Sequence, residues 1–165
     1  MGYSDFYNST DELIKHLQPL ISSFDESIKT KYAGFLAVTA VTVYELAIKD
    51  VFIAFASKKN YVFGNYVEHN FQRINGRIKI ADLNSYTKQF GEKYLDKFKL
   101  IIDKEDKKIV DQKKGYDLKN SYNNLLQCRH DFVHKNHTQL TFDDVVKYYF
   151  IGKIVIDCLY KTMKR

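Results

Sequence analysis

The chain has 165 residues, of which 45% are hydrophobic and 15% aromatic, so the composition excludes a disordered protein and suits one domain with a substantial core. Seven glycines and one proline are too few for the many turns of a β-sandwich, and we therefore expect an all-α protein. The formal net charge of +6 arises entirely within residues 58–165, since residues 1–57 carry four lysines against seven acidic residues. This asymmetry favours a polyanionic partner such as RNA or DNA, although many Lys-rich surfaces have none.

Cysteine usage and hydropathy indicate a cytoplasmic protein. Two cysteines, Cys128 and Cys158, are too few for a disulfide scaffold. The N-terminus lacks a basic region followed by an apolar run, so we expect no signal peptide. The most apolar stretch, residues 32–56, contains three charged residues, and its longest uncharged run is shorter than the roughly 18 residues that a membrane span needs.

The first helix is predicted to start at Ser9, because Ser9 and Glu12 have the spacing of a capping box. Pro19 lies inside the apolar periodicity that follows, so we expect it to kink this helix or to split it into two pieces. The periodic apolar positions are Leu13, Leu17, Leu20, Phe24 and Ile28.

A second helix, from about Tyr32 to Ser57, is apolar on nearly every side and should be central. Glu45 lies in its middle and has two interpretations. It forms an i,i+4 ion pair with Lys49 on an exposed edge, or it is a buried carboxylate that needs a cation such as Arg129.

Residues 58–92 contain several turn signals, and we expect two short helices between them, over Tyr66–Ile74 and Ile80–Phe90. Arg73, Arg77 and Lys79 alternate with apolar residues here, which suits either contact with an RNA backbone or a solvated helix edge. Another helical stripe covers residues 94–102, and the charge run 103–114 reads as its solvated end and a loop.

The next helix is predicted from about Asp117 to Lys135, and Arg129 occupies one of its apolar positions. The opposite side carries amides and imidazoles, and between the two terminal lysines Arg129 is the only basic residue. Such a face suggests a helix covered on both sides, by the core on one and by a partner or substrate on the other. The residues of the polar face are Asn120, Asn123, Gln127, His130 and His134.

Thr141 is the predicted N-cap of a last helix that runs to about Met163. Its main stripe includes Val145 and Tyr149, while Phe150 and Ile154 add apolar surface beside it. Two apolar faces on one helix indicate dimerisation. We thus expect an all-α, up-and-down bundle of four to five main helices that forms a homodimer, with residues 1–165 as a single helical domain.

Arg129 and His134 are suited together to cleavage of an RNA phosphodiester. A histidine exchanges protons near neutral pH, and an arginine binds the phosphate and stabilises charge in the transition state, so neither step needs a metal or another cofactor. Five residues separate the two, which places them roughly 140° apart around an ideal helix. Either the long arginine curls round the helix, or the helix ends near His134, or the two groups meet only when two copies of the helix face each other; the last option fits the uncharged polar face and the apolar last helix.

The pattern of Arg129, four residues and His134, with polar His130 directly after the arginine, resembles the R-x4–6-H motif of the HEPN superfamily. The resemblance covers almost the whole chain, including a short loop and a long last helix after the motif. It implies a metal-independent endoribonuclease whose site forms across a homodimer, acting as a toxin of a toxin–antitoxin pair or in antiviral defence (abortive infection). A cognate antitoxin or other regulator is then expected.

The resemblance assigns catalytic roles to Arg129, which binds the phosphate, and to His134, the general acid and base, with His130 in support. Glu45 resembles an acidic residue that some members place beside the arginine. The RNA contacts expected besides these are Arg73, Arg77, Lys79, Asn123, Gln127 and Lys135. One departure is Asn136, where some family toxins have a modifiable tyrosine.

Two alternatives stay open from the sequence. In the first alternative, the chain is a catalytically inactive HEPN-like binding or regulatory module that uses the same dimer. Otherwise His130, His134 and His137, at i, i+4 and i+7, bind a metal in a helical bundle.

Overall fold

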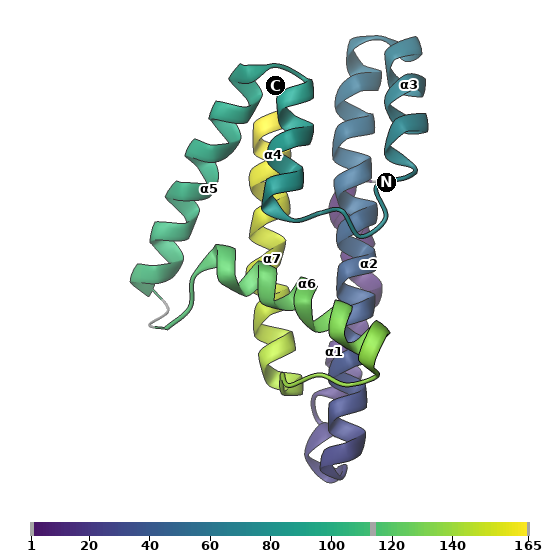
Figure 1. Ribbon diagram of the computed structural model, residues 1–165, viewed down its shortest axis with the longest axis vertical. Coiled ribbons are helices and arrows are strands. Elements are labelled where there is room, and N and C mark those ends of the chain that lie inside the picture. Colours follow the sequence, from purple (N-terminus) through teal and green to yellow (C-terminus); the bar gives the residue numbers. More distant parts are fainter. Residues whose placement is uncertain (1, 113–114, 165) are drawn as a thin grey trace.

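The computed structural model describes residues 2–112 and 115–164, and these contain seven α-helices, two 3-10 turns and no strand (Figure 1). The all-α prediction is confirmed. Four helices are long and three are short, as the residue ranges show. The elements are η1 (Tyr3–Tyr7), α1 (Asn8–Leu17), η2 (Ile21–Ser23), α2 (Glu26–Lys59), α3 (Tyr61–Phe71), α4 (Ile80–Gln89), α5 (Glu92–Gln112), α6 (Leu118–Lys135) and α7 (Phe142–Met163).

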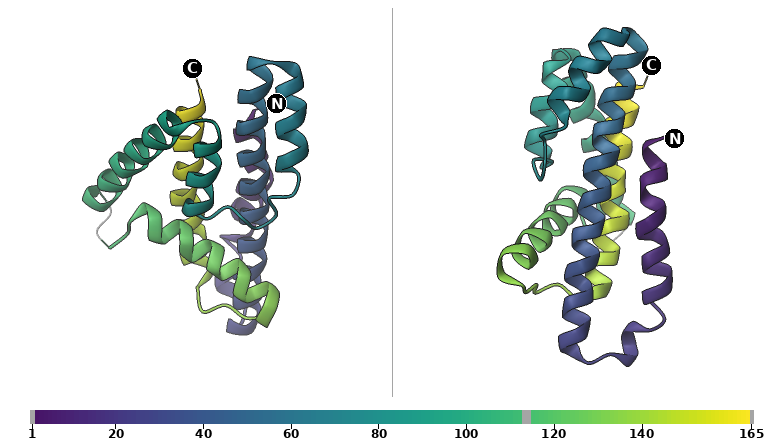
Figure 2. Two further views of the ribbon diagram at one scale, coloured as in Figure 1. Left: turned by 45° about the horizontal axis from the view of Figure 1, so that its top comes forward. Right: turned by 90° about the vertical axis from the view of Figure 1, so that its right-hand side faces the viewer.

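The α2 and α7 helices form the centre of the bundle and run side by side in the same direction. In the right-hand view of Figure 2 this pair lies between α1 on one side and α4 and α6 on the other, and α5 packs against α7. The helices from α1 to α5 reverse direction one after another, and α6 crosses the central pair obliquely. The packing is close where α6 meets α2, because a Cβ on Gly34 would collide with the Phe132 ring.

The α1 helix starts earlier than the capping box predicts. The chain is already helical from Tyr3, where the Asp5 carboxylate accepts a hydrogen bond of 2.7 Å from the Gly2 amide. Ser9 therefore lies inside the helix, and its predicted N-cap role is wrong. The split near Pro19 is confirmed, since α1 ends at Leu17.

Local caps explain where the other helices begin. The Asp25 carboxylate accepts from the Ile28 amide, so α2 starts six residues before Tyr32, and the Asn60 carboxamide starts α3 five residues before Tyr66. Thr141, the predicted N-cap of α7, accepts a hydrogen bond from the Asp144 amide, and Asp117, where α6 was predicted to start, accepts one from the Asn120 amide.

The charge run after residue 102 is helical as far as Gln112, and an i,i+3 pair between Glu105 and Lys108 supports it. Residues 113 and 114, the end of that predicted run, lie outside the described residues.

The two apolar faces of α7 are both used within the chain, which corrects the argument for dimerisation from this helix. Because α2, α5 and α6 surround α7, Ile151 and Val155 beside the main stripe are buried, and Ile154 is half-buried. Only Phe150, with 45% of its surface exposed, faces outward among the predicted extra apolar positions.

Candidate active site

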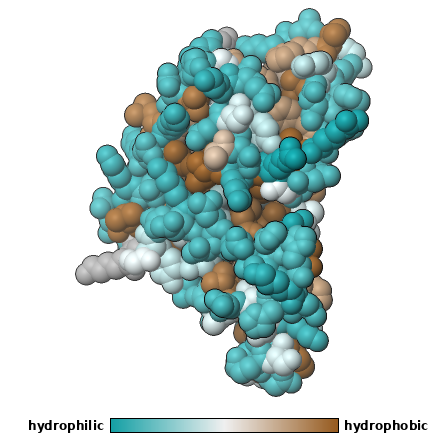
Figure 3. All heavy atoms as spheres, viewed as in Figure 1, coloured by the Kyte–Doolittle hydropathy of each residue, from teal (hydrophilic) through white to brown (hydrophobic). Residues whose placement is uncertain are grey.

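A pocket of about 580 Å³ opens between α6, the start of α4 and the turn at Gly76. The floor is apolar, with Val41 of α2, Ile80 and Leu126. Polar side chains of α6 form its rim, and in Figure 3, which views this face, the surface over α6 is mainly hydrophilic. The remaining lining residues are Gly76, Lys79, Ala81, Asn123, Asn124, Gln127, Arg129 and His130.

Arg129 is half-buried and lines this pocket. Its Nη1 atom lies 3.9 Å from the position that a Cβ on Gly76 would occupy, and Gly76 has a φ of +71°, a left-handed conformation that suits glycine. Among the described residues no carboxylate oxygen lies within 4.0 Å of the guanidinium. Within the part of the chain that the structure describes, the guanidinium thus lies at a pocket wall without an ion pair.

Glu45 has neither of the two predicted ion pairs. Its Oε1 accepts a hydrogen bond of 2.8 Å from the Gly76 amide. Lys49 instead donates to the Gln72 carbonyl and to Asn75 Oδ1, each at 3.3 Å. The predictions fail because residues 72–76 fold back over this part of α2 and use both side chains. Glu45 therefore fixes the turn against which Arg129 lies, and it leaves the guanidinium free.

The two histidines of the motif are exposed and touch each other. His130 lines the pocket with Arg129, and its ring centroid lies 4.5 Å from that of His134, one turn further on. The three side chains of the motif thus follow one another along α6, from inside the pocket to a point beyond its lining. His134 is in the last turn of the helix, which ends at Lys135.

The alternative of a metal site on this helix is not supported. Asn136 adopts a left-handed conformation with a φ of 52°, which ends α6 and takes His137 out of the i+7 register. Within residues 2–112 and 115–164, no three His, Cys, Asp or Glu side chains are grouped so that they could hold a metal ion.

The structure brings together only part of the predicted RNA contacts. Lys79, Asn123 and Gln127 line the pocket with Arg129. Lys135 lies outside the lining and pairs with Asp131 at 2.7 Å, and Gln127 Nε2 donates to the same carboxylate at 3.2 Å. Arg73 and Arg77 are exposed in the connection between α3 and α4.

Six lining residues were missed by sequence reasoning: the apolar Val41, Ile80, Ala81 and Leu126, together with Gly76 and Asn124. Gly76 was noted only as a turn signal, and nothing local indicates that its turn reaches α6. Asn124 lies beside Asn123, and its outward position was the only available signal.

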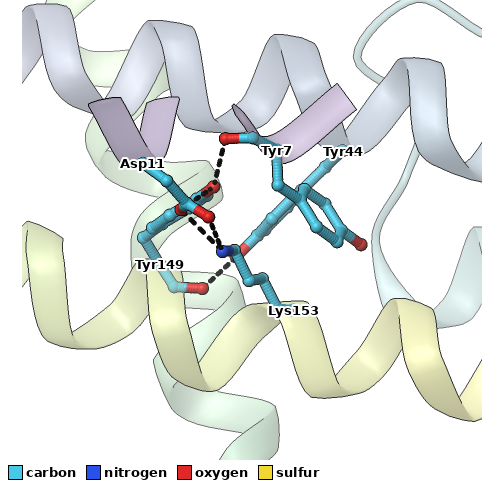
Figure 4. Close-up of polar contacts among 5 residues, drawn as sticks. All are labelled: Tyr7, Asp11, Tyr44, Tyr149 and Lys153. Atoms are coloured by element: carbon cyan, nitrogen blue, oxygen red, sulfur yellow. Dashed lines mark hydrogen bonds and ion pairs between the residues drawn. The ribbon is translucent and has the colours of Figure 1, made fainter. Parts of the chain in front are cut away.

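A second charged cluster, shown in Figure 4, lies between α1 and α7. The Lys153 ammonium is 2.6 and 2.8 Å from the two carboxylate oxygens of Asp11 and lies over the rings of Tyr7 and Tyr149, at 4.8 and 4.6 Å from their centroids. The Tyr149 hydroxyl donates to Asp11 at 2.9 Å, and burial, followed by this hydrogen bond, raises the pKa of Tyr149 far above its ordinary value. Each charge here has a partner, and the cluster attaches α1 to the bundle.

Comparison with known proteins gives one match. A family described as RiboL-PSP-HEPN matches residues 4–165. No curated protein and no solved structure matches the chain. In the part of the chain that the structure describes, no helix has the length and apolarity to cross a membrane.

Proposed function

Because the chain belongs to the RiboL-PSP-HEPN family, a HEPN-type family associated with nuclease and other RNA-related functions, we propose that it is a metal-independent endoribonuclease. The observation that carries the proposal is the half-buried Arg129, which lines a pocket with His130 and has no carboxylate partner among the described residues. A cation in that setting suits a phosphate, which accepts two hydrogen bonds from a guanidinium.

The proposed reaction is an internal transfer at one RNA phosphate. A histidine accepts the proton of the ribose 2′-OH, and the 2′-oxygen forms a bond to phosphorus. The bond from phosphorus to the 5′-oxygen of the next nucleotide breaks, and a protonated group donates a proton to that oxygen. The products are a 2′,3′-cyclic phosphate and a free 5′-hydroxyl. Arg129 stabilises the charge on the phosphate oxygens, His134 acts as the acid and base, and His130 orients or assists it.

A homodimer is part of the proposal, because Arg129 lines the pocket whereas His134 lies beyond its lining. A second α6 would bring the His134 of one copy toward the Arg129 of the other. Two exposed apolar side chains near the end of α6 suit such an interface: Phe35, 55% exposed and in edge contact with the Phe132 ring, and Val133, 51% exposed. The proposal of a dimer therefore rests on these two exposed side chains and not on the second apolar face of α7.

Control by a second molecule follows from the activity itself. An unregulated ribonuclease damages the RNA of its own cell, so we propose a toxin or antiviral effector with a cognate antitoxin or other regulator.

The direct test is RNA cleavage in excess EDTA by the wild type, Arg129→Ala and His134→Ala. We expect the wild type to remain active and each variant to lose at least about 100-fold in rate. His16→Ala, an exposed histidine on α1, is the matched control and should cleave normally. Loss of cleavage on adding EDTA would contradict the metal-independent mechanism. If neither variant differs from the wild type, the motif has been assigned wrongly.

The dimer is tested by mixing the two inactive variants. A shared site should recover part of the activity, because a mixed dimer retains one intact Arg129 and one intact His134. Val133→Glu should give a monomer by light scattering and should cleave poorly. A wild-type monomer that cleaves RNA would exclude the shared site. An inactive wild type that also leaves growth unaffected on expression would favour the binding-module alternative.

A further inference from the structure

The outward face of α3 is the most exposed apolar surface of the described chain. Val62 and Tyr66, one turn apart on the same side of α3, are 72% and 65% exposed, and Tyr61, in the first turn and roughly 140° round the helix from Tyr66, is 76% exposed. Gly64 and Val67 are buried against the bundle. The outward side of a short surface helix normally carries charges, yet residues 60–67 contain none. Hydrophobic colouring is visible over the α2–α3 hairpin at the upper right of Figure 3.

This face is rigidly placed. A Cβ on Gly64 would collide with the Ser57 side chain, so α3 lies unusually close to α2, and the Asn60 carboxamide caps its first turn. The rings of Tyr61 and Tyr66 are therefore presented from a helix whose backbone is fixed against α2.

A small pocket of about 210 Å³ lies beside the Tyr66 ring, between α3 and the end of α4. Tyr66, Phe63 and Phe90 contribute aromatic walls, and Asn70 and Gln89 contribute carboxamides. Flat apolar walls with adjacent donors and acceptors match an unpaired nucleobase, which stacks by its face and forms hydrogen bonds at its edge.

The charges around α3 favour a polyanion over a protein partner. Between residues 51 and 81 the chain has five basic residues against a single acidic one, Glu68. Lys58 and Lys59 precede α3, whereas the other three basic residues follow it and lead toward the Arg129 pocket. These three are Arg73, Arg77 and Lys79.

The α4 helix joins the two pockets. Its first residues, Ile80 and Ala81, line the Arg129 pocket, and Gln89 at its end lines the small pocket. A helix of ten residues spans about 15 Å, so a single strand of a few nucleotides reaches from one to the other.

We propose that the outer face of α3 is a stacking platform for unpaired bases of single-stranded RNA. The backbone of the strand follows Arg73, Arg77 and Lys79 to Arg129. This inference rests on the proposed ribonuclease function and adds to it a substrate class, since the bases of a duplex are paired and cannot stack on Tyr61 and Tyr66.

The test is binding of a fluorescent uridine oligonucleotide with 2′-deoxy sugars, which resists cleavage by 2′-OH attack, measured by anisotropy. Tyr61→Ala with Tyr66→Ala should weaken binding by about 30-fold or more, since the stacking of two bases is removed. Tyr61→Phe with Tyr66→Phe keeps both rings and should bind like the wild type. Leu100→Ala, which removes an equally exposed apolar side chain from α5, should have no effect. Thermal unfolding checks that each variant is folded.

Salt dependence separates stacking from charge. Arg73→Ala with Arg77→Ala should reduce the slope of log affinity against log salt by roughly 0.7 for each phosphate that the variant no longer neutralises. The double tyrosine variant should leave that slope unchanged. Unchanged RNA binding by the double alanine variant of the tyrosines would overturn the proposal, and a changed oligomeric state in that variant would assign the face to a protein interface instead.

The binding assay and the cleavage assay test the stacking platform and the ribonuclease function independently of each other. If RNA is never cleaved but binding depends on the two tyrosines, the platform stands and the proposed ribonuclease does not. If cleavage depends on Arg129 and His134 while the tyrosines affect neither binding nor the rate, the ribonuclease stands and the platform does not.

Discussion

Lys153 and Arg129 are two partly buried cations with opposite surroundings. The Lys153 side chain is 17% exposed, lies within 2.8 Å of both oxygens of Asp11, and is covered by aromatic rings (Figure 4). Arg129 is half-buried at a pocket wall, and the nearest acidic candidate, Glu45, hydrogen-bonds to the Gly76 amide instead. Lys153 is paired with a carboxylate of the same chain, whereas Arg129 forms no ion pair with the described residues.

The difference separates structural from functional charge without reference to any family. Removing one member of a buried pair leaves the other uncompensated, so a paired cation is costly to mutate. A partly buried cation without a partner is stabilised by no carboxylate, so its removal costs the fold little. If Arg129 binds the phosphate as proposed, the two sites should respond to mutation in opposite ways.

The largest expected effect is at the unpaired site. Arg129→Ala should lower single-turnover RNA cleavage by about 100- to 1,000-fold, because it removes a charge that stabilises the transition state. Its free energy of unfolding in urea should change by less than about 1 kcal/mol, since no ion pair is removed. A stability loss as large as that of a Lys153 variant would show that Arg129 is structural, and the comparison would fail.

The paired site should show the reverse. Lys153→Ala leaves the Asp11 carboxylate without its cation and should lower the free energy of unfolding by about 2–3 kcal/mol. We expect less than the loss typical of a fully buried pair, because the Asp11 side chain is 40% exposed. Cleavage per folded molecule should be unchanged. Reduced cleavage by fully folded Lys153→Ala would connect the cluster to the active site.

Replacing both Asp11 and Lys153 tests whether an unpaired charge, and not the loss of the pair itself, causes the loss of stability. Asp11→Leu with Lys153→Met removes the pair without leaving either charge alone, and its stability should lie within about 1 kcal/mol of the wild type. The Tyr149 hydroxyl retains the Tyr7 carbonyl as an acceptor, at 3.4 Å. A double variant as unstable as Lys153→Ala would mean that the rings, and not the pairing of charges, determine the stability of this cluster.

Sequence reasoning located α6 and α7 well because their starts depend on local chemistry. Asp117 and Thr141 accept hydrogen bonds from amides a few residues away, and such caps are readable from short patterns. The same kind of pattern misled at Ser9, since a chain already helical from Tyr3 does not need a cap there.

The surroundings of the site could not be predicted, because they depend on contacts between residues far apart in the sequence. Glu45 was assigned a cation from its charge, but its partner is a backbone amide 31 residues away. The two apolar faces of α7 predicted a second chain, although helices of the same chain cover most of both and leave Phe150 exposed. The partly buried position of Arg129 could be predicted from the sequence, because this charged residue occupies an apolar position of the helical stripe. Its roles and those of His130 and His134 remain predictions.

The smallest expected effect concerns the exposed ion pair between Asp131 and Lys135, at the outer edge of the site. Asp131 is ion-paired with Lys135 and accepts from Gln127, and the hydrogen bonds from Lys135 and then Gln127 lower the pKa of its carboxyl. An RNA phosphate must compete with this carboxylate for both side chains. Asp131→Asn should therefore strengthen RNA binding by about 3-fold at low salt and less at high salt, as expected for an exposed pair.

The control for Asp131→Asn is Glu12→Gln, which changes the net charge equally on an exposed position of α1. An equal gain in both variants would indicate a general charge effect. No gain in Asp131→Asn would place Lys135 and Gln127 outside the RNA interface. A gain in Asp131→Asn alone would add a third kind of cation to the comparison of Lys153 with Arg129. Lys153 keeps its carboxylate partner and Arg129 has none, whereas Lys135 would exchange the Asp131 carboxylate for an RNA phosphate. The strength of pairing would then decrease from the core toward the proposed path of the RNA.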